Sequence, residues 1–158
     1  MKQLKSFFAT IALLLCCIPA GAVDFEMGGI YYNITDSEKL TVEVTYRDYE
    51  DLDYFEEYTG NVVIPESVRY SNKTYSVTRI GNSAFSYCDG LTSITIPNSV
   101  THIGKSAFLS CTNLSSATIG NGITTIGTTV FAYCSSLTSI TIPDGVTIIG
   151  SSAFYDCI

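Results

Sequence analysis

The chain has few residues of the types that act in catalysis or bind metals. Among these, the cysteines have the most regular spacing. Four of the six cysteines recur at intervals of 23 residues: Cys88, Cys111, Cys134 and Cys157. An even number of cysteines can indicate a disulfide framework, whereas zinc sites use closely spaced pairs that this chain lacks. Because cysteine is small and often buried, the spacing favours a column of free thiols in a repeating core.

The single histidine offers little support for catalysis. His102 takes a position that is held one interval earlier or later by Arg79, Thr125 and Ile148. A position that accepts such different side chains faces solvent, so we expect His102 to be exposed rather than to act as a base. The chain has no Gly-x-Ser-x-Gly turn, phosphate loop or histidine cluster. The sequence therefore predicts a protein that is not an enzyme and has no cofactor.

One acidic segment is rich in tyrosine. Between residues 48 and 58 the carboxylates alternate with aromatic residues; the acids are Asp48, Glu50, Asp51, Asp53, Glu56 and Glu57. Carboxylates are the ligands that calcium prefers, but the segment lacks the glycine and the closing glutamate of an EF-hand loop. We interpret it as a solvated acidic loop, with a calcium site or a protein-contact patch as alternatives.

These residues belong to a unit that repeats. Residues 88–110 return with the same spacing from Cys111 and from Cys134, and a further unit opens at Cys157. The apolar and glycine positions of the first unit are Cys88, Leu91, Ile94, Ile96, Val100, Ile103, Gly104, Ala107 and Phe108. A fixed period of this size indicates a solenoid, in which each unit buries its apolar residues against its neighbours.

Each unit combines two extended segments with a turn. The alternation at 94–96 predicts a strand, which ends at Pro97 because proline cannot donate to the ladder. Residues 100–104 predict a second, shorter extended segment, and residues 106–110 predict one turn of α- or 3₁₀-helix. The expected fold is a leucine-rich repeat solenoid, mainly β, with a parallel strand ladder.

The combined pattern resembles a known family. Ile-x-Ile-Pro, Val-x-x-Ile-Gly, Ala-Phe-x-x-Cys and the following leucine are similar to the BspA-like leucine-rich repeats of bacterial surface proteins. The resemblance covers residues 62–158, although the middle unit departs from it at Ala117, Gly120 and Val130. It implies a secreted or cell-surface protein that mediates protein–protein contact or adhesion to host cells or matrix.

The outward face of the strand ladder is the candidate binding surface. If Ile94 and Ile96 point inward, the residues between them point outward and form two rows: Ser93, Ser116 and Ser139, and Thr95, Thr118 and Thr141. The resemblance implies that ligands bind on this face. The alternative is that serine and threonine are simply polar residues that suit an exposed strand.

The N-terminus predicts export. Lys2 and Lys5 precede an apolar run over 7–18, and small residues end it, as in a secretory signal peptide cleaved after Ala22. Acylation of Cys16 or Cys17 is an alternative. No other stretch predicts a transmembrane span.

Residues 23–61 predict an N-terminal β cap with the acidic loop. Residues 29–35 and 40–47 alternate like the two strands of a hairpin. Repeats follow over 62–158, and the first carries an inserted hairpin over 69–76. Because the chain stops two residues into a unit, we expect it to be a fragment of a longer protein.

The net charge of the chain limits the classes of partner that we expect. The chain has 8 basic and 15 acidic residues, a net charge of −7, so a nucleic-acid partner is not expected. Two functions remain: an adhesin that binds a protein partner through the repeats, or a structural spacer of a larger envelope protein. A more remote interpretation is that the hydroxyl rows bind glycan or ice.

Overall fold

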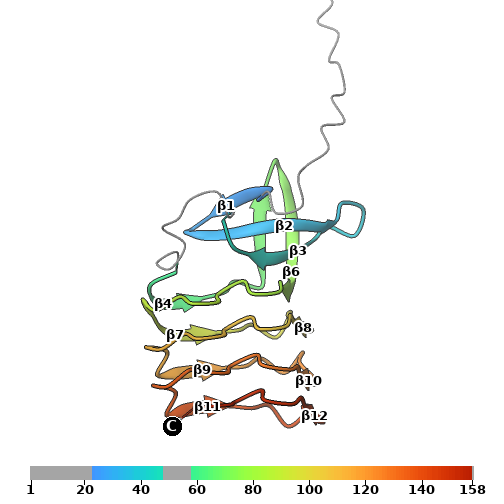
Figure 1. Cartoon of the computed structure of the whole chain (residues 1–158). Coiled ribbons are helices and arrows are strands. Elements are labelled where there is room, and N and C mark those ends of the chain that lie inside the picture. Colours follow the sequence, from blue (N-terminus) through green and yellow to red (C-terminus); the bar gives the residue numbers. More distant parts are fainter. Residues whose placement is uncertain (1–22, 48–57, 158) are drawn as a thin grey trace, which may run out of the picture.

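The computed structural model describes residues 23–47 and 58–157. It shows a stack of similar rungs under an N-terminal cap (Figure 1). Each rung contributes one strand to a front sheet and another strand to a second ladder. The predicted signal peptide and most of the acidic segment lie outside the described residues, as does Ile158.

The front sheet is parallel and four-stranded, in the order β11-β9-β7-β4. Its strands are β4 (Gly60–Val63), β7 (Leu91–Thr95), β9 (Ser116–Thr118) and β11 (Ser139–Thr141). Residues one repeat apart are direct partners, as Ile94, Ala117 and Ile140 show. This register confirms the predicted parallel ladder, with inward isoleucines every second residue.

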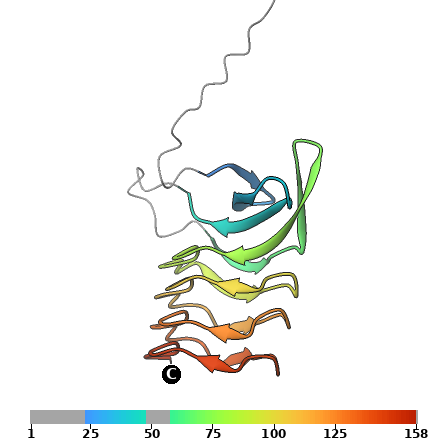
Figure 2. The ribbon, with the colours of Figure 1, turned by 90° about the vertical axis from the view of Figure 1, so that its right-hand side faces the viewer.

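After the long first strand β6, the strands of the second ladder have two residues each. β6 (Lys73–Ile80) pairs in parallel with β8 (His102–Ile103), and β10 (Thr125–Ile126) pairs with β12 (Ile148–Ile149). These strands confirm the predicted second extended segment. They join the front strands through the turns seen at both ends of the rungs in Figure 2.

The cap is antiparallel and joins the second ladder. β1 (Phe25–Met27), β2 (Ile30–Asp36) and β3 (Thr41–Thr45) are consecutive antiparallel strands, and β3 pairs in parallel with β6. The hairpin of β2 and β3 was predicted, but β1 was not. Only Phe25 of its three residues is buried, which is too short a pattern to predict a strand.

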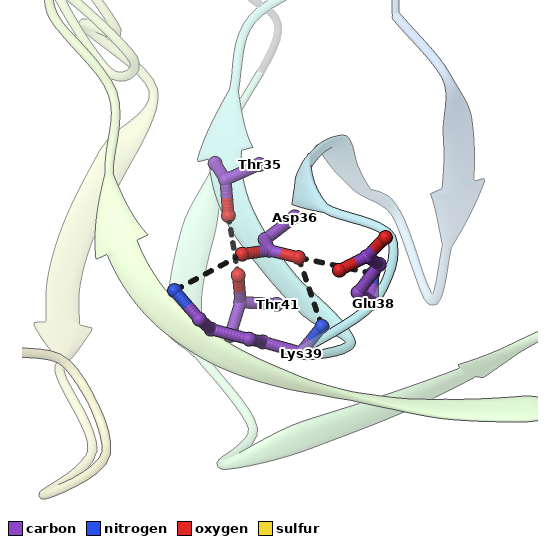
Figure 3. A network of polar contacts seen from close by, with 5 residues as sticks. All are labelled: Thr35, Asp36, Glu38, Lys39 and Thr41. Carbon is purple, nitrogen blue, oxygen red and sulfur yellow. Dashed lines mark hydrogen bonds and ion pairs between the residues drawn. The ribbon is translucent and has the colours of Figure 1, made fainter.

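The turn from β2 to β3 is held by its own polar groups (Figure 3). Asp36 Oδ1 accepts hydrogen bonds from the amides of Glu38 and Lys39, at 2.9 and 2.8 Å. Lys39 Nζ lies 3.3 Å from Asp36 Oδ2, and the hydroxyls of Thr35 and Thr41 are 2.8 Å apart. The Lys39 amide is the main cause of the lowered pKa of Asp36.

The inserted hairpin is formed by β5 (Ser67–Tyr70) and β6. Its two turn residues, Ser71 and Asn72, both have positive φ, at 47° and 64°. Turns of that kind match the twist of a two-residue hairpin. The hairpin projects beside the cap, above the rungs (Figure 2).

The predicted helical turn was wrong. Residues 106–110 form a turn without a helix, and the described residues contain no helix at all. Ser106 and Ser110 are left-handed, with φ of 56° and 58°. The amides of Phe108 and Ser110 donate to the carbonyls of Val130 and Ala132 in the next rung, at 2.9 and 2.8 Å. A helix would need those amides for itself.

A column of stacked phenylalanines runs through the core. The rings of Phe85, Phe108, Phe131 and Phe154 are nearly parallel, with centroids 4.9 to 5.5 Å apart. Tyr58 continues the column at the cap end, 4.5 Å from Phe85, and its hydroxyl donates to the carbonyl of Thr45 at 2.5 Å. The column therefore links every described rung to the cap.

Candidate interaction surface

The six predicted ligand-contact residues lie on the front sheet, in register. Ser93, Ser116 and Ser139 are consecutive partners across the strands, and so are Thr95, Thr118 and Thr141. Adjacent strands lie about 4.8 Å apart, so each row presents one hydroxyl per rung. Thr118, Ser139 and Thr141 are exposed, whereas Ser93, Thr95 and Ser116 are half-buried.

The two rows differ at the cap end in what their hydroxyls do, whereas the hydroxyls of Ser116 and Ser139 make no hydrogen bond to the described part of the chain. Ser93 Oγ donates to Asn61 Oδ1 at 2.5 Å, so the upper end of the serine row is engaged. In the described residues, the hydroxyls of Thr95, Thr118 and Thr141 make no hydrogen bond to protein atoms. The threonine row therefore presents its hydrogen-bonding capacity outward.

Other hydroxyls of the repeats are used within the stack. Ser115 and Thr138 donate to the carbonyls of Thr92 and Ser115, at 3.0 and 3.4 Å. On the second ladder, Thr101 and Thr147 donate to carbonyls one rung earlier, at 3.3 and 3.4 Å. Those hydroxyls support the structure, in contrast to the threonine row.

Two further residues belong to the rows and were not predicted. Asn61 pairs with Ser93 and Val63 pairs with Thr95, so they occupy the first rung of each row. Val63 is 59 % exposed. The match between residues 62–65 and 94–97 could have identified Val63, because it aligns Val63 with Thr95.

The surface carries almost no charge. Between residues 81 and 158 the charged side chains are Asp89, Lys105, Asp144 and Asp156. None of the eight residues of the two rows is charged. Recognition on this face would therefore depend on hydrogen bonds and contact area rather than on ion pairs.

The cysteine column lies in the core. Cys88, Cys111 and Cys134 are buried, Cys157 is half-buried, and all four are free thiols. The thiols of Cys111, Cys134 and Cys157 donate to the carbonyls of Phe85, Phe108 and Phe131, at 2.9 to 3.1 Å. Hydrogen bonding to Cys134 and burial raise the pKa of Cys111. The column therefore serves packing and backbone hydrogen bonding.

The remaining candidates do not form a site within the described residues. His102 is exposed, as predicted, although partial loss of hydration and, to a smaller extent, nearby Arg79 lower its pKa. No group of three histidine, cysteine or acidic residues in the described ranges could hold a metal ion. The suggested calcium site falls on residues 48–57, outside those ranges. The described part of the chain also has no helix that is long and apolar enough to cross a membrane.

Solved structures resemble this fold. A leucine-rich repeat protein from Bacteroides ovatus is 36% identical, with a TM-score of 0.73 over 85% of this chain, but the match spans only 33% of that protein. One from Bacteroides capillosus is 32% identical, with a TM-score of 0.66 over 79% of this chain and 86% of that one. The T. pallidum leucine rich repeat protein, at 22% identity and a TM-score of 0.57 over 84% of this chain and 67% of that one, shares the fold. No curated protein was found to match the chain.

The sequence also matches a described family. The family called "BspA type Leucine rich repeat region (6 copies)" matches residues 61–158, more than half of the chain. The stacked rungs, the parallel front ladder and the repeated Cys–Phe core agree with the pattern that suggested it. The chain belongs to the BspA-type leucine-rich repeat family.

Proposed function

We propose that this chain is a non-enzymatic secreted or cell-surface protein that binds a protein partner through the threonine and serine rows of its front sheet. Host matrix and cell-surface proteins are the partners that fit an adhesive role. The observation that carries the proposal is the threonine row, whose hydroxyls make no internal hydrogen bond although neighbouring hydroxyls in the same rungs do.

The chemistry of the rows suits a protein surface. Hydroxyls at regular intervals can exchange hydrogen bonds with backbone and side-chain groups of a partner. Weakly charged contact areas are common in the centres of protein interfaces, where charged residues are depleted. Val63 adds an exposed apolar side chain at the cap end of the threonine row.

The test is a binding screen of the purified chain against host matrix proteins, with neutral glycans as a second panel. The variant Thr95→Lys/Thr118→Lys/Thr141→Lys places three charges on the front sheet. Its matched control, His102→Lys/Thr125→Lys/Ile148→Lys, places three lysines on the same three rungs, at exposed positions of β8, β10 and β12 in the second ladder. Circular dichroism and thermal melting confirm that both variants fold.

The expected result is a saturable interaction that the front-sheet variant loses and the control variant retains. Equal binding by both variants would place recognition elsewhere on the molecule. If the chain binds a glycan but no protein, the partner is a glycan and not the proposed protein. A well-folded chain that retains no partner would instead favour a structural spacer in a larger envelope protein.

We also propose that residues 1–22 direct export and are removed after Ala22, leaving the cap over 23–61 and the repeats over 62–158. The basic start, the apolar run and the small residues before Val23 support this proposal. Mass spectrometry of the exported protein tests it. An N-terminus at Val23 is expected, whereas a lipid-modified N-terminus at Cys16 or Cys17 would support acylation instead.

A further inference from the structure

The cap covers the two ladders unequally. On the second ladder, β3 pairs in parallel with β6 and so continues the stack into the cap. On the front sheet, β4 is the first strand, and within the described residues it pairs with β7 alone. The outer edge of β4 therefore has no neighbouring strand, although cap strands lie above it (Figure 1).

The backbone of β4 shows which groups this leaves open. The amide of Gly60 donates to Gly90 O at 2.7 Å, and that of Ile64 donates to Thr95 O at 3.0 Å. Because alternate residues of a strand direct their backbone groups to opposite edges, Asn61 and Val63 direct theirs away from β7. No hydrogen bond in the described part of the chain uses these groups, and an unpaired edge of this kind accepts another strand.

A hollow of about 340 Å³ lies along the same edge. Three consecutive residues of β4 line it: Asn61, Val62 and Val63. Since neighbouring side chains point to opposite faces of a strand, a hollow that touches all three follows the edge rather than one face. Ile30, Tyr58 and Thr59 line it as well.

The opposite wall of the hollow is the turn between β1 and β2. Its residues, Gly28 and Gly29, have φ of +63° and +78°, and a Cβ on either would meet no atom within 4 Å. These two glycines contribute no side chain, so among the residues that the structure describes the space beside β4 can admit a backbone.

We propose that an extended, uncharged segment of a partner protein binds here as an additional strand on the outer edge of β4. Main-chain hydrogen bonds to Asn61 and Val63 would provide affinity, as in other cases of strand addition. Side chains directed inward, on the side of Val62, would meet Ile30 and Tyr58 and should be apolar. None of the residues that line the hollow is charged.

The position of the cap indicates that the partner at the β4 edge is a single extended segment and not a folded second copy of this chain. β1 to β3 lie over the end of the stack in both views (Figures 1 and 2), so another stack cannot approach this edge. The site uses the outer backbone edge of β4, whereas the proposed function uses outward side chains, although Asn61 and Val63 belong to both. The front-sheet variant Thr95→Lys/Thr118→Lys/Thr141→Lys leaves β4 unchanged, so peptide binding by that variant distinguishes this proposal from the proposed function.

The probe is a fluorescent peptide of residues 91–97, the segment whose strand already pairs with the other edge of β4. Val63→Pro removes the outward amide without removing a β4–β7 hydrogen bond, because edge strands tolerate proline. Val63→Thr is the matched control, since threonine occupies the same position on the next rung. Anisotropy measures binding, and hydrogen exchange of the unmodified protein measures which amides the peptide protects.

We expect Val63→Pro to weaken binding at least about tenfold, equivalent to roughly 1.4 kcal/mol, and Val63→Thr to change it less than about twofold. The peptide should slow exchange at Asn61 and Val63. Equal binding by the two variants, protection at the exposed edge of β11 instead, or no binding to the unmodified chain would each overturn the proposal. Self-association that depends on residue 63 would also overturn the proposal, because it would show that a second copy reaches this edge despite the cap.

Discussion

At the scale of single residues, the cysteine column has a specific role. Each of Cys111, Cys134 and Cys157 points its thiol at a phenylalanine carbonyl of the preceding rung. That carbonyl also accepts the amide of the cysteine in its own rung, as Phe108 does from Cys111 at 3.4 Å. A buried carbonyl has room for two hydrogen bonds, and cysteine supplies the second while filling the core.

Thiol accessibility follows from this placement. We expect iodoacetamide at pH 8 to modify Cys157 first, because it is only half-buried, and to leave Cys88, Cys111 and Cys134 intact. Burial raises the pKa of Cys157, so its labelling rate should still increase above the ordinary thiol pKa of about 8.5. Peptide mass spectrometry locates the adducts, with the same protein in denaturant as the fully labelled control. Equal labelling of all four in the folded chain would contradict the buried column.

Glu43 gives a test of charge burial where the cap meets the repeats. Its side chain lies 3.7 Å from Arg79 and is 27% exposed. Burial raises the pKa of Glu43, and Arg79 opposes the effect only in part. When a carboxyl has a higher pKa in the folded chain than in the unfolded chain, its ionisation destabilises the fold. The fold therefore loses stability as the pH rises from the pKa of the unfolded chain to that of the folded chain.

We therefore expect Glu43→Gln to melt at the same temperature as the unmodified protein or higher at pH 7. The difference should shrink as the pH falls below the ordinary glutamate pKa of about 4.3, because the carboxyl then becomes protonated in both states. Thermal melting by circular dichroism at both pH values measures it. A variant that is less stable at pH 7 than at pH 4, relative to the unmodified protein, would show that the Arg79 contact dominates.

At the scale of elements, the glycine after the second strand is needed for close approach of two rungs. A Cβ on Gly104 would lie 2.5 Å from Asn82 N and 2.6 Å from Gly81 C, both backbone atoms. At the equivalent position one rung later, a Cβ on Gly127 would meet only Val130 Cγ2, at 3.7 Å. The same sequence motif therefore has different packing in neighbouring rungs.

These two glycines form a matched pair. We expect Gly104→Ala to destabilise the fold by about 1–3 kcal/mol, because backbone must move to admit the methyl group. Gly127→Ala should change stability by less than about 1 kcal/mol, and in the stabilising direction if it restricts the unfolded chain. Urea unfolding with a common slope measures both. Similar losses in the two variants would show that the rungs pack alike.

At the scale of the whole molecule, the core stays buried along the stack until the last described rung, where side chains become exposed. In one column of equivalent residues, Ile103 is 4% exposed, Ile126 0% and Ile149 54%. In a solenoid each rung is stabilised mainly by its neighbours, and the last described rung has one neighbour instead of two. Local opening should therefore be easiest there.

Hydrogen exchange tests whether the last described rung opens more easily than the others. We expect amides of the last rung, such as Gly150, to exchange at least about tenfold faster than the equivalent amide of Gly104. Both amides donate to a carbonyl one rung earlier, at 2.8 and 2.9 Å, so the comparison holds hydrogen bonding constant. Uniform protection along the stack would mean that the rungs open together as one cooperative unit.

The sequence by itself determined the repeating part of this protein. The 23-residue period, the alternation at Ile94 and Ile96 and the cysteine column predict the stacked core, because every unit meets a copy of its own pattern. The hairpin of β2 and β3 was also predictable, since its two strands are neighbours in sequence. In both cases the alternation of apolar and polar residues along a short stretch is enough to predict the strands.

Features that depend on hydrogen bonds between residues far apart in the sequence were decided only by the tertiary structure. The turn at residues 106–110 is not helical because its amides bond to carbonyls about one repeat away, in a rung that local sequence does not reveal. The cap strand β3 joins β6 and leaves β4 open, a choice between two edges that no local pattern encodes. The physical reason is the same: a strand or an amide satisfies its hydrogen bonds with whatever group the fold brings beside it.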